Sequence, residues 1–180
     1  MICLKQNFKI AVSGMMVALS VVFMLLSYFP YFTYAAPAVT GLFMMLIVIE
    51  INCKWAFIAY AAASVLIFIF AEPESKLLYI CLFGYYPIVK SLIDRIRKPF
   101  IEWPLKLLIF NAAVLLIYLL FSHFITAISL EDFGELGKYG AYIFLAAGNL
   151  IFVLYDIAIS RMAMVYMSIL HPKIKKLFKL

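Results

Sequence analysis

The stretch FGYYPIVKSLIDRIRKPFIEW, residues 83–103, joins the end of an apolar segment to a run of charged side chains. Gly84 and Pro87 lie close together in its apolar part, and the chain becomes basic from Lys90 onward. Proline removes a backbone hydrogen-bond donor and bends a helix, whereas glycine lets a neighbouring element approach closely. We therefore predict a helix over residues 76–93 that is kinked at these two positions.

The composition decides what kind of helix this is. The chain has 180 residues, of which 68% are hydrophobic and 13% charged, with a mean hydropathy of +1.10. A soluble domain is about half apolar and about one quarter charged. So much apolar surface cannot be buried in one soluble core, so we expect an integral membrane protein. No polar linker divides the chain, which favours a single membrane domain over residues 1–180.

Apolar runs predict the number of spanning helices, because a helix needs about 20 mostly apolar residues to cross a bilayer. The first run has no small-residue cleavage site after it and is interpreted as a retained helix. The second is short, so a five-helix chain in which it is fused to the third is the main alternative. Barrel strands would alternate polar and apolar residues, and these runs do not. The six predicted helices cover residues 9–29, 38–49, 55–71, 76–93, 105–127 and 139–170.

The basic residues predict the orientation. With six helices, only Lys76 and Lys138 of the 15 lysines and arginines fall on one side, and that side is also acidic. Basic residues collect on the cytoplasmic side of membrane proteins. We therefore expect an all-α, six-helix fold with both termini cytoplasmic. Fusing the second and third helices would destroy the asymmetry, which favours six helices over five.

The main cytoplasmic loop follows the kinked helix. Apolar residues recur every four positions from Ile88 to Phe100, with basic residues between them. This pattern predicts an amphipathic surface helix that lies on anionic membrane lipid or docks a partner protein. Tyr85 and Tyr86 are expected in an interfacial belt of aromatic residues.

Three polar residues lie where membrane helices are predicted: Glu50, Asn111 and Asp156. Ionisable residues in a membrane span are candidates for function. Asp156 shares one helical face with Asn149 and Ser160. A structural polar cluster is the favoured interpretation, since polar side chains often join membrane helices. In that interpretation Asp156 would pair with Arg161, Lys90 or Lys106.

A ligand cavity that opened outward would be lined by polar and aromatic groups near the acidic side. A histidine satisfied at the interface is the simpler interpretation of His123. The candidate substrate-binding residues are Tyr31, Tyr34, Glu74, Tyr118, His123, Tyr142 and Asn149.

Several classes of enzyme are excluded by missing motifs. The chain has no Walker A loop, no H-E-x-x-H and no G-x-S-x-G. The three cysteines show no CxxC spacing and the two histidines lie far apart, so we expect no metal site and no cofactor. No catalytic residue and no nucleic-acid partner is predicted, and a membrane enzyme using Asp156 is a minor hypothesis.

The chain resembles the substrate-binding S components of energy-coupling factor (ECF) transporters. The likeness rests on KIAVSGMMVALSVVF at residues 9–23, on the segment 37–95 and on WPLKLLIFNAAVLLIYLL at residues 103–120. It resembles an uncharacterised branch with E-x(4)-W, here Glu50 to Trp55, and the FGYYPI-K pattern. It covers nearly the whole chain and indicates a branch rather than a substrate.

The resemblance implies a bacterial multi-pass membrane protein that binds a vitamin or other micronutrient in an outward-facing pocket. It further implies docking on a transmembrane coupling subunit driven by two cytoplasmic ATPases. Family members dock through an A-x-x-x-A pattern on the first helix. Here Gly14 and Ala18 match that pattern, with Ala11 one turn earlier, and the glycine keeps the position small. The alternative class is a membrane scaffold or assembly subunit, which would need no small-molecule pocket.

Overall fold

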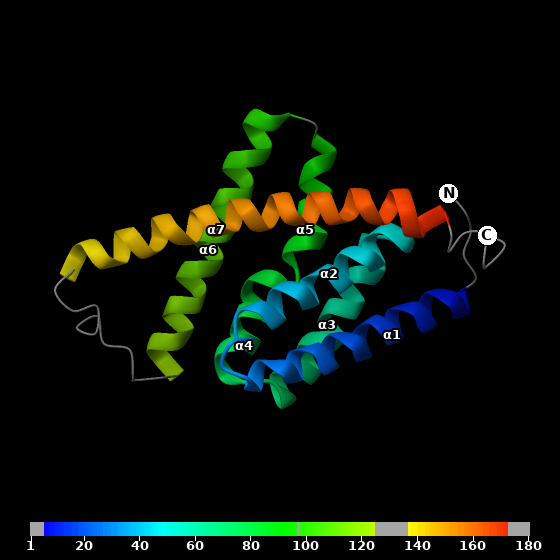
Figure 1. The fold of residues 1–180 in the computed structure, drawn as a ribbon, viewed down its shortest axis with the longest axis horizontal. Helices are drawn as coiled ribbons and strands as arrows, with labels where there is room; N and C mark the ends of the chain where they lie inside the picture. The colour runs from blue at the N-terminus through cyan, green and yellow to red at the C-terminus, as the bar shows by residue number, and fades with distance from the viewer. Residues whose placement is uncertain (1–5, 97, 125–136, 173–180) are drawn as a thin grey trace.

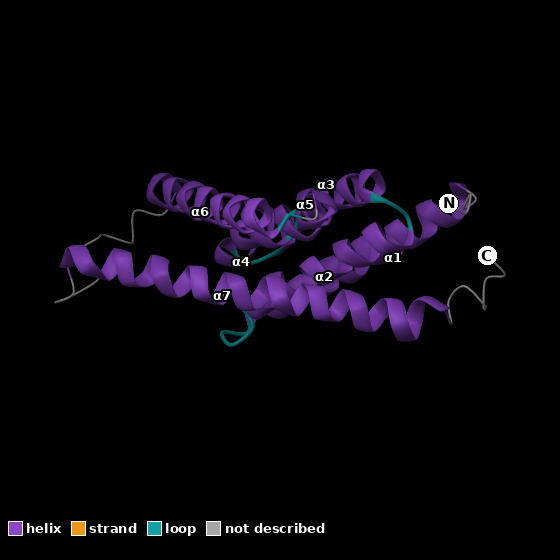
Figure 2. Ribbon diagram, turned by 90° about the horizontal axis from the view of Figure 1, so that it is seen from above, coloured by secondary structure: helices purple, strands orange, loops and turns teal. Residues whose placement is uncertain are grey.

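The structure is a computed structural model that describes residues 6–96, 98–124 and 137–172, although the side chains at 118, 120–124, 137–142 and 144 lie outside that description. The described residues form helices joined by short connections, with no strand among them (Figures 1 and 2). The first half contains α1 (Gln6–Leu25), the 3₁₀ turn η1 (Leu26–Tyr28), α2 (Ala35–Glu50) and α3 (Cys53–Phe70). The second half contains α4 (Pro73–Leu78), the π-helical turn η2 (Tyr79–Phe83), α5 (Tyr86–Ile93), the 3₁₀ turn η3 (Asp94–Ile96), α6 (Pro99–Phe124), α7 (Gly137–Val165) and the π-helical turn η5 (Tyr166–Leu170).

Five helical segments within the described residues are long and apolar enough to cross a membrane: 6–28, 53–70, 73–96, 99–117 and 145–170. The remaining apolar helix, α2, has 16 residues. At about 1.5 Å per residue it is about 24 Å long, which is less than the hydrocarbon core of about 30 Å. The predicted short second helix is therefore confirmed.

The boundary between α2 and α3 is a genuine helix end, so the fused alternative is wrong. The chain leaves the helical conformation at Ile51 and Asn52. The Asn52 side chain then caps α3, because its Oδ1 accepts a hydrogen bond of 3.0 Å from the backbone N–H of Trp55.

The central helix is α2. It contacts α1, α3, α5 and α7, and in Figure 1 it lies between α1 and α7. Thr40, Met44 and Ile47 of α2 are fully buried. A helix surrounded by protein needs less contact with lipid, which fits the short length of α2.

Two sets of contacts define the two ends of the bundle. At one end, Tyr166 Oη donates to Glu50 Oε1 at 2.7 Å, and Cys53 Sγ lies 3.3 Å from Ser91 Oγ. We call this the basic end, because Lys54, Arg95 and Lys98 lie there. The beginning of α1 and the end of α7 lie on the same side in Figure 1.

The opposite end joins the other connections. Tyr28 Oη donates to the Phe70 carbonyl at 3.0 Å, and Ser75 Oγ donates to the Thr33 carbonyl at 2.9 Å. The chain therefore passes back and forth between two ends, as the predicted antiparallel spans require.

The predicted kink is confirmed: a π-helical turn and a two-residue turn separate α4 from α5 within the helical segment 73–96. The backbone N–H of Gly84 bonds to the Tyr79 carbonyl at 2.8 Å, which closes a π-helical turn. Tyr60 Oη of α3 donates to the Ile80 carbonyl in that turn at 2.6 Å. A β-carbon on Gly84 would lie 2.7 Å from the Tyr60 ring, so glycine is needed for this close approach. Pro87 then stands in the first turn of α5.

A second glycine, Gly41 of α2, packs closely against the end of the π-helical turn, and the sequence pattern does not predict this contact. A β-carbon on Gly41 would clash with the Phe83 carbonyl and with the Tyr155 hydroxyl. Pro87 has no N–H, so it cannot donate the helical hydrogen bond that the Phe83 carbonyl would otherwise accept. Gly41 thus provides space for a backbone carbonyl that Pro87 has left without its helical donor.

The prediction of one amphipathic surface helix from Ile88 to Phe100 is wrong. The helix α5 ends at Ile93, and α6 begins at Pro99. Ile88 is fully buried in the core formed by α2 and α3, while Phe100 is exposed. A period of four in the sequence therefore spanned two helices with different environments.

Two smaller predictions also need correction. Tyr86 does not lie in an interfacial belt, because it is fully buried. The fifth predicted helix begins at Pro99 rather than after Pro104, so Pro104 lies inside α6. It leaves the Phe100 carbonyl without a helical donor, which is tolerated because Phe100 is exposed near the helix start.

Candidate functional site

The buried charged side chains of the described residues gather around Asp156 of α7, which is 3% exposed. Tyr86 Oη donates to Asp156 Oδ1 at 2.5 Å, and Lys90 Nζ donates to the same oxygen at 2.6 Å. Lys106 Nζ of α6 lies 3.3 Å from Oδ2. Both oxygens of the carboxylate are therefore engaged by groups from α5 and α6.

Asp94 contacts the two lysines from the exposed side of this group of residues. Its Oδ1 lies 2.7 Å from Lys106 Nζ and its Oδ2 lies 3.4 Å from Lys90 Nζ. The Asp94 side chain is 42% exposed, whereas the lysine side chains are 5% and 6% exposed. We call Tyr86, Lys90, Asp94, Lys106 and Asp156 the ion cluster. With both lysines and both aspartates charged, the ion cluster has no net charge.

The local sequence explains how the cluster assembles. Tyr86, Lys90 and Asp94 are spaced four residues apart, so they stack on one face of α5 and η3. Lys106 lies two turns inside α6 and meets the same carboxylate. Buried charges are costly unless each is paired and hydrogen-bonded. The cluster therefore acts as a polar junction of α5, α6 and α7.

The structural interpretation of Asp156 is confirmed for two of its three proposed partners, Lys90 and Lys106. Arg161 is instead exposed. Ser160 shares the face of Asp156, as predicted, but its hydroxyl donates to the Asp156 backbone carbonyl at 2.9 Å. Asp94 was not recognised from the sequence, although its position four residues after Lys90 was a usable signal.

A second polar contact joins α6 and α7. Asn111 Nδ2 donates to Asn149 Oδ1 at 3.0 Å, and Asn149 Nδ2 donates to Asn111 Oδ1 at 3.2 Å. Each amide also donates to the carbonyl four residues earlier in its own helix, at 2.8 Å. We call Asn111 and Asn149 the amide pair.

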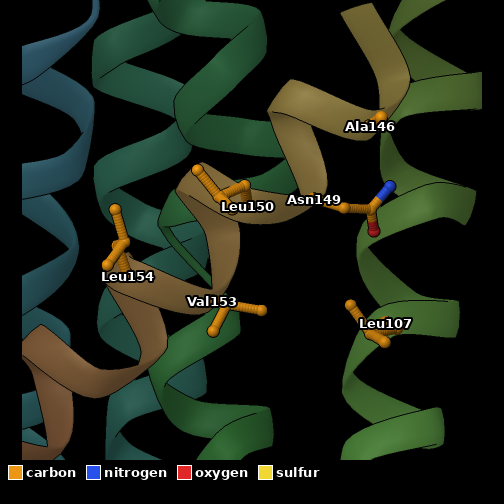
Figure 3. Close-up of a pocket in the computed structure, with 6 residues that line it drawn as sticks. All are labelled: Leu107, Ala146, Asn149, Leu150, Val153 and Leu154. Carbon is orange, nitrogen blue, oxygen red and sulfur yellow. The ribbon is translucent and has the colours of Figure 1, made fainter. Parts of the chain in front are cut away.

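Next to the amide pair, an open groove of about 380 Å³ runs between α6 and α7. Figure 3 shows the Asn149 side chain pointing toward α6, with Leu107 on α6 below it. The lining is almost entirely apolar and suits a hydrocarbon chain better than a polar nutrient. The lining residues are Leu107, Ala146, Asn149, Leu150, Val153 and Leu154.

The predicted ligand residues fall in several places. Tyr31 and Tyr34 are exposed in the α1–α2 connection, and Glu74 is exposed at the start of α4. All three lie at the opposite end, whereas Asn149 faces α6 in the amide pair. The side chains of three further candidates lie outside the description: Tyr118, His123 and Tyr142.

The predicted docking residues form an exposed face of α1. Ala11, Gly14 and Ala18 are all exposed, and a β-carbon on Gly14 would meet nothing within 4 Å. The other face of α1 carries Ser20 and Met24, which are buried as α1 packs on α2 and α3. The small-residue face is thus not used for packing within the described part of the chain.

Glu50, whose role was open, joins the ends of two helices. Its Oε1 accepts the hydrogen bond of Tyr166 and lies 3.1 Å from His171 Nδ1. It therefore fixes the end of α7 against the end of α2.

Searches with this chain against protein-family models, curated proteins and solved structures found no match. The likeness to S components consequently rests on the residues quoted above.

Proposed function

We propose that this chain is the substrate-binding subunit of an ECF-type importer in a bacterial cell membrane. In this proposal the basic end faces the cytoplasm, with both termini on that side. The chain captures a vitamin or other micronutrient from outside. It docks on a transmembrane coupling subunit that is driven by two cytoplasmic ATPases.

The observation that carries the proposal is the exposed small-residue face of α1. Small side chains let a second helix approach closely within a membrane. Ala11 and Ala18 are exposed and a β-carbon on Gly14 would meet nothing within 4 Å, so packing among the described residues does not require small side chains here. A partner helix seated on this face explains it. The sequence carries no nucleotide-binding motif, so uphill transport requires such a partner.

Co-purification tests the docking face. Replacing Gly14 with leucine is expected to lower the yield of co-purified coupling subunit at least ten-fold, because the added side chain keeps the helices apart. Met15→Leu is the matched control, since Met15 is exposed on the same helix and already large. Equal recovery from the two variants would contradict the docking role.

A second candidate, a membrane scaffold, is favoured by one observation. The groove between α6 and α7 is apolar, and the amide pair beside it is already satisfied. Mass spectrometry of the purified protein separates the two candidates. The importer subunit is expected to release a small polar molecule in near-stoichiometric amount, and a scaffold is expected to release only lipid.

A further inference from the structure

Asp94 differs from the other charged members of the ion cluster in its exposure. Lys90, Lys106 and Asp156 are nearly fully buried, whereas the Asp94 side chain is 42% exposed. Asp94 also lies in η3, a 3₁₀ turn of three residues between α5 and α6. A single side-chain rotation would therefore carry its carboxylate away from the lysines and into the surroundings.

The charges that remain after such a rotation are unbalanced. Two lysines would face one carboxylate, that of Asp156, and one positive charge would stay buried without a partner. An unpaired buried charge is strongly unfavourable, so the site requires an anion in the place of Asp94.

The geometry of Asp94 indicates which anion fits. Its two oxygens contact two different lysines, Oδ1 at 2.7 Å from Lys106 and Oδ2 at 3.4 Å from Lys90. The replacement must therefore present at least two oxygens on one centre. A carboxylate does so, as Asp94 shows, and a phosphoryl group does too; lysine binds phosphate as a compact point charge.

We propose that Lys90 and Lys106 form a binding site for a phosphoryl group, and that Asp94 occupies this site in the present structure as an internal substitute. A singly charged phosphoryl group, such as a phosphodiester or the monoanion of phosphate, can displace Asp94 and leave the net charge of the cluster unchanged. The group can belong to a lipid headgroup or to free phosphate. Exposed apolar side chains around η3, those of Leu92, Ile96 and Phe100, make a lipid able to reach the site. The proposal does not depend on the transport function.

The test uses the full-length protein and the variant Asp94→Asn, which removes the competing charge. Thermal unfolding is followed in neutral detergent with inorganic phosphate, against potassium chloride of equal ionic strength. The half-saturating phosphate concentration is expected to be at least ten-fold lower for Asp94→Asn than for the unsubstituted protein. The matched control is Glu102→Gln, which removes a nearby carboxylate outside the cluster and should respond like the unsubstituted protein.

A second arm identifies the source of the phosphoryl group. The same proteins are placed in nanodiscs of digalactosyldiacylglycerol, a bilayer lipid without phosphate, with or without phosphatidylglycerol. Stabilisation of Asp94→Asn by phosphate in detergent supports a free anion, and stabilisation by phosphatidylglycerol alone supports a headgroup. In either case the double variant Asp94→Asn with Lys106→Gln should lose the response. A response of Asp94→Asn no larger than that of Glu102→Gln in both arms overturns the proposal.

A third measurement covers the case in which Asp94→Asn does not fold. Native mass spectrometry of the unsubstituted protein, equilibrated with equal amounts of the two lipids, should show preferential retention of phosphatidylglycerol. The preference should disappear in Lys106→Gln. Equal retention by the two proteins overturns the proposal.

Discussion

The ion cluster and the amide pair join the same two helices by different means. Asp156 and Asn149 lie seven residues apart on one face of α7, and Lys106 and Asn111 lie five residues apart on α6. The Asp156 side chain in the ion cluster takes all its partners there, Tyr86, Lys90 and Lys106, from other helices. Each side chain of the amide pair also donates to its own helix. The ion cluster therefore forms only when the helices are together, whereas each amide keeps a hydrogen bond within its own helix.

We therefore expect the ion cluster to contribute much more than the amide pair to the stability of the fold. A buried charge that loses its partner is penalised heavily. An amide that loses its partner keeps the bond to its own helix, and interhelical hydrogen bonds in membranes average only about 0.6 kcal/mol. Substituting one residue of the ion cluster or of the amide pair at a time, and measuring the free energy of unfolding, tests this difference.

The largest effect is expected from Asp156→Asn. It leaves Lys90 and Lys106 with Asp94 alone, and removing one partner of a buried ion pair costs about 3–5 kcal/mol. Reversible unfolding in mixed detergent micelles measures the change. The control is Arg161→Gln, an exposed charge on the same helix. Equal losses of stability in the two variants would show that the ion cluster does not hold the helices together.

An intermediate effect is expected from Tyr86→Phe. The substitution removes the hydrogen bond of 2.5 Å to Asp156 but keeps the edge-to-face contact with Phe152, whose ring centroid lies 4.8 Å away. A hydrogen bond to a charged group contributes about 1.5–3 kcal/mol. The same unfolding assay measures it, with Tyr28→Phe as the control because Tyr28 makes an exposed hydrogen bond. If the two tyrosine variants lose equal stability, the hydrogen bond from the Tyr86 hydroxyl to Asp156 does not contribute the expected free energy of unfolding.

The smallest effect is expected from Asn149→Ala. Asn111 keeps its bond to the Leu107 carbonyl, and two interhelical hydrogen bonds of about 0.6 kcal/mol each are lost, so the loss should be about 1 kcal/mol. The measurement is again reversible unfolding, compared with Ala146→Gly in the same groove. A loss larger than that of Tyr86→Phe would reverse the ranking and make the amide pair the principal contact.

The sequence predicted the helices well because length and hydropathy decide whether a segment can cross a membrane. It also predicted the kink at Gly84 and Pro87, since both residues act on the backbone locally. It failed where a partner distant in the chain decides the outcome. The pattern around Lys90 predicts a surface helix that lies on lipid or docks a partner, and this is wrong, although the suggested pairing of Lys90 with Asp156, 66 residues later, is confirmed.

Gly41 illustrates the same limit. Nothing near it in the sequence indicates that the Phe83 carbonyl, 42 residues later, needs its space. Of the candidate sites, the pairing of Asp156 could be anticipated from charge alone, because a buried carboxylate requires a cation. The ligand candidates Tyr31, Tyr34 and Glu74 were chosen by their predicted depth and polarity, and their role stays a prediction.

The proposed function depends most directly on which side of the membrane the basic end faces. Single cysteines can be introduced at Lys98 and Glu74, both exposed at opposite ends, after Cys3, Cys53 and Cys81 are replaced with serine. Labelling with a membrane-impermeant maleimide in intact cells then reports the side. The account predicts labelling of the cysteine at position 74 in intact cells and of that at position 98 only after permeabilisation. The reverse pattern would contradict it, because cytoplasmic ATPases could not then act at the basic end.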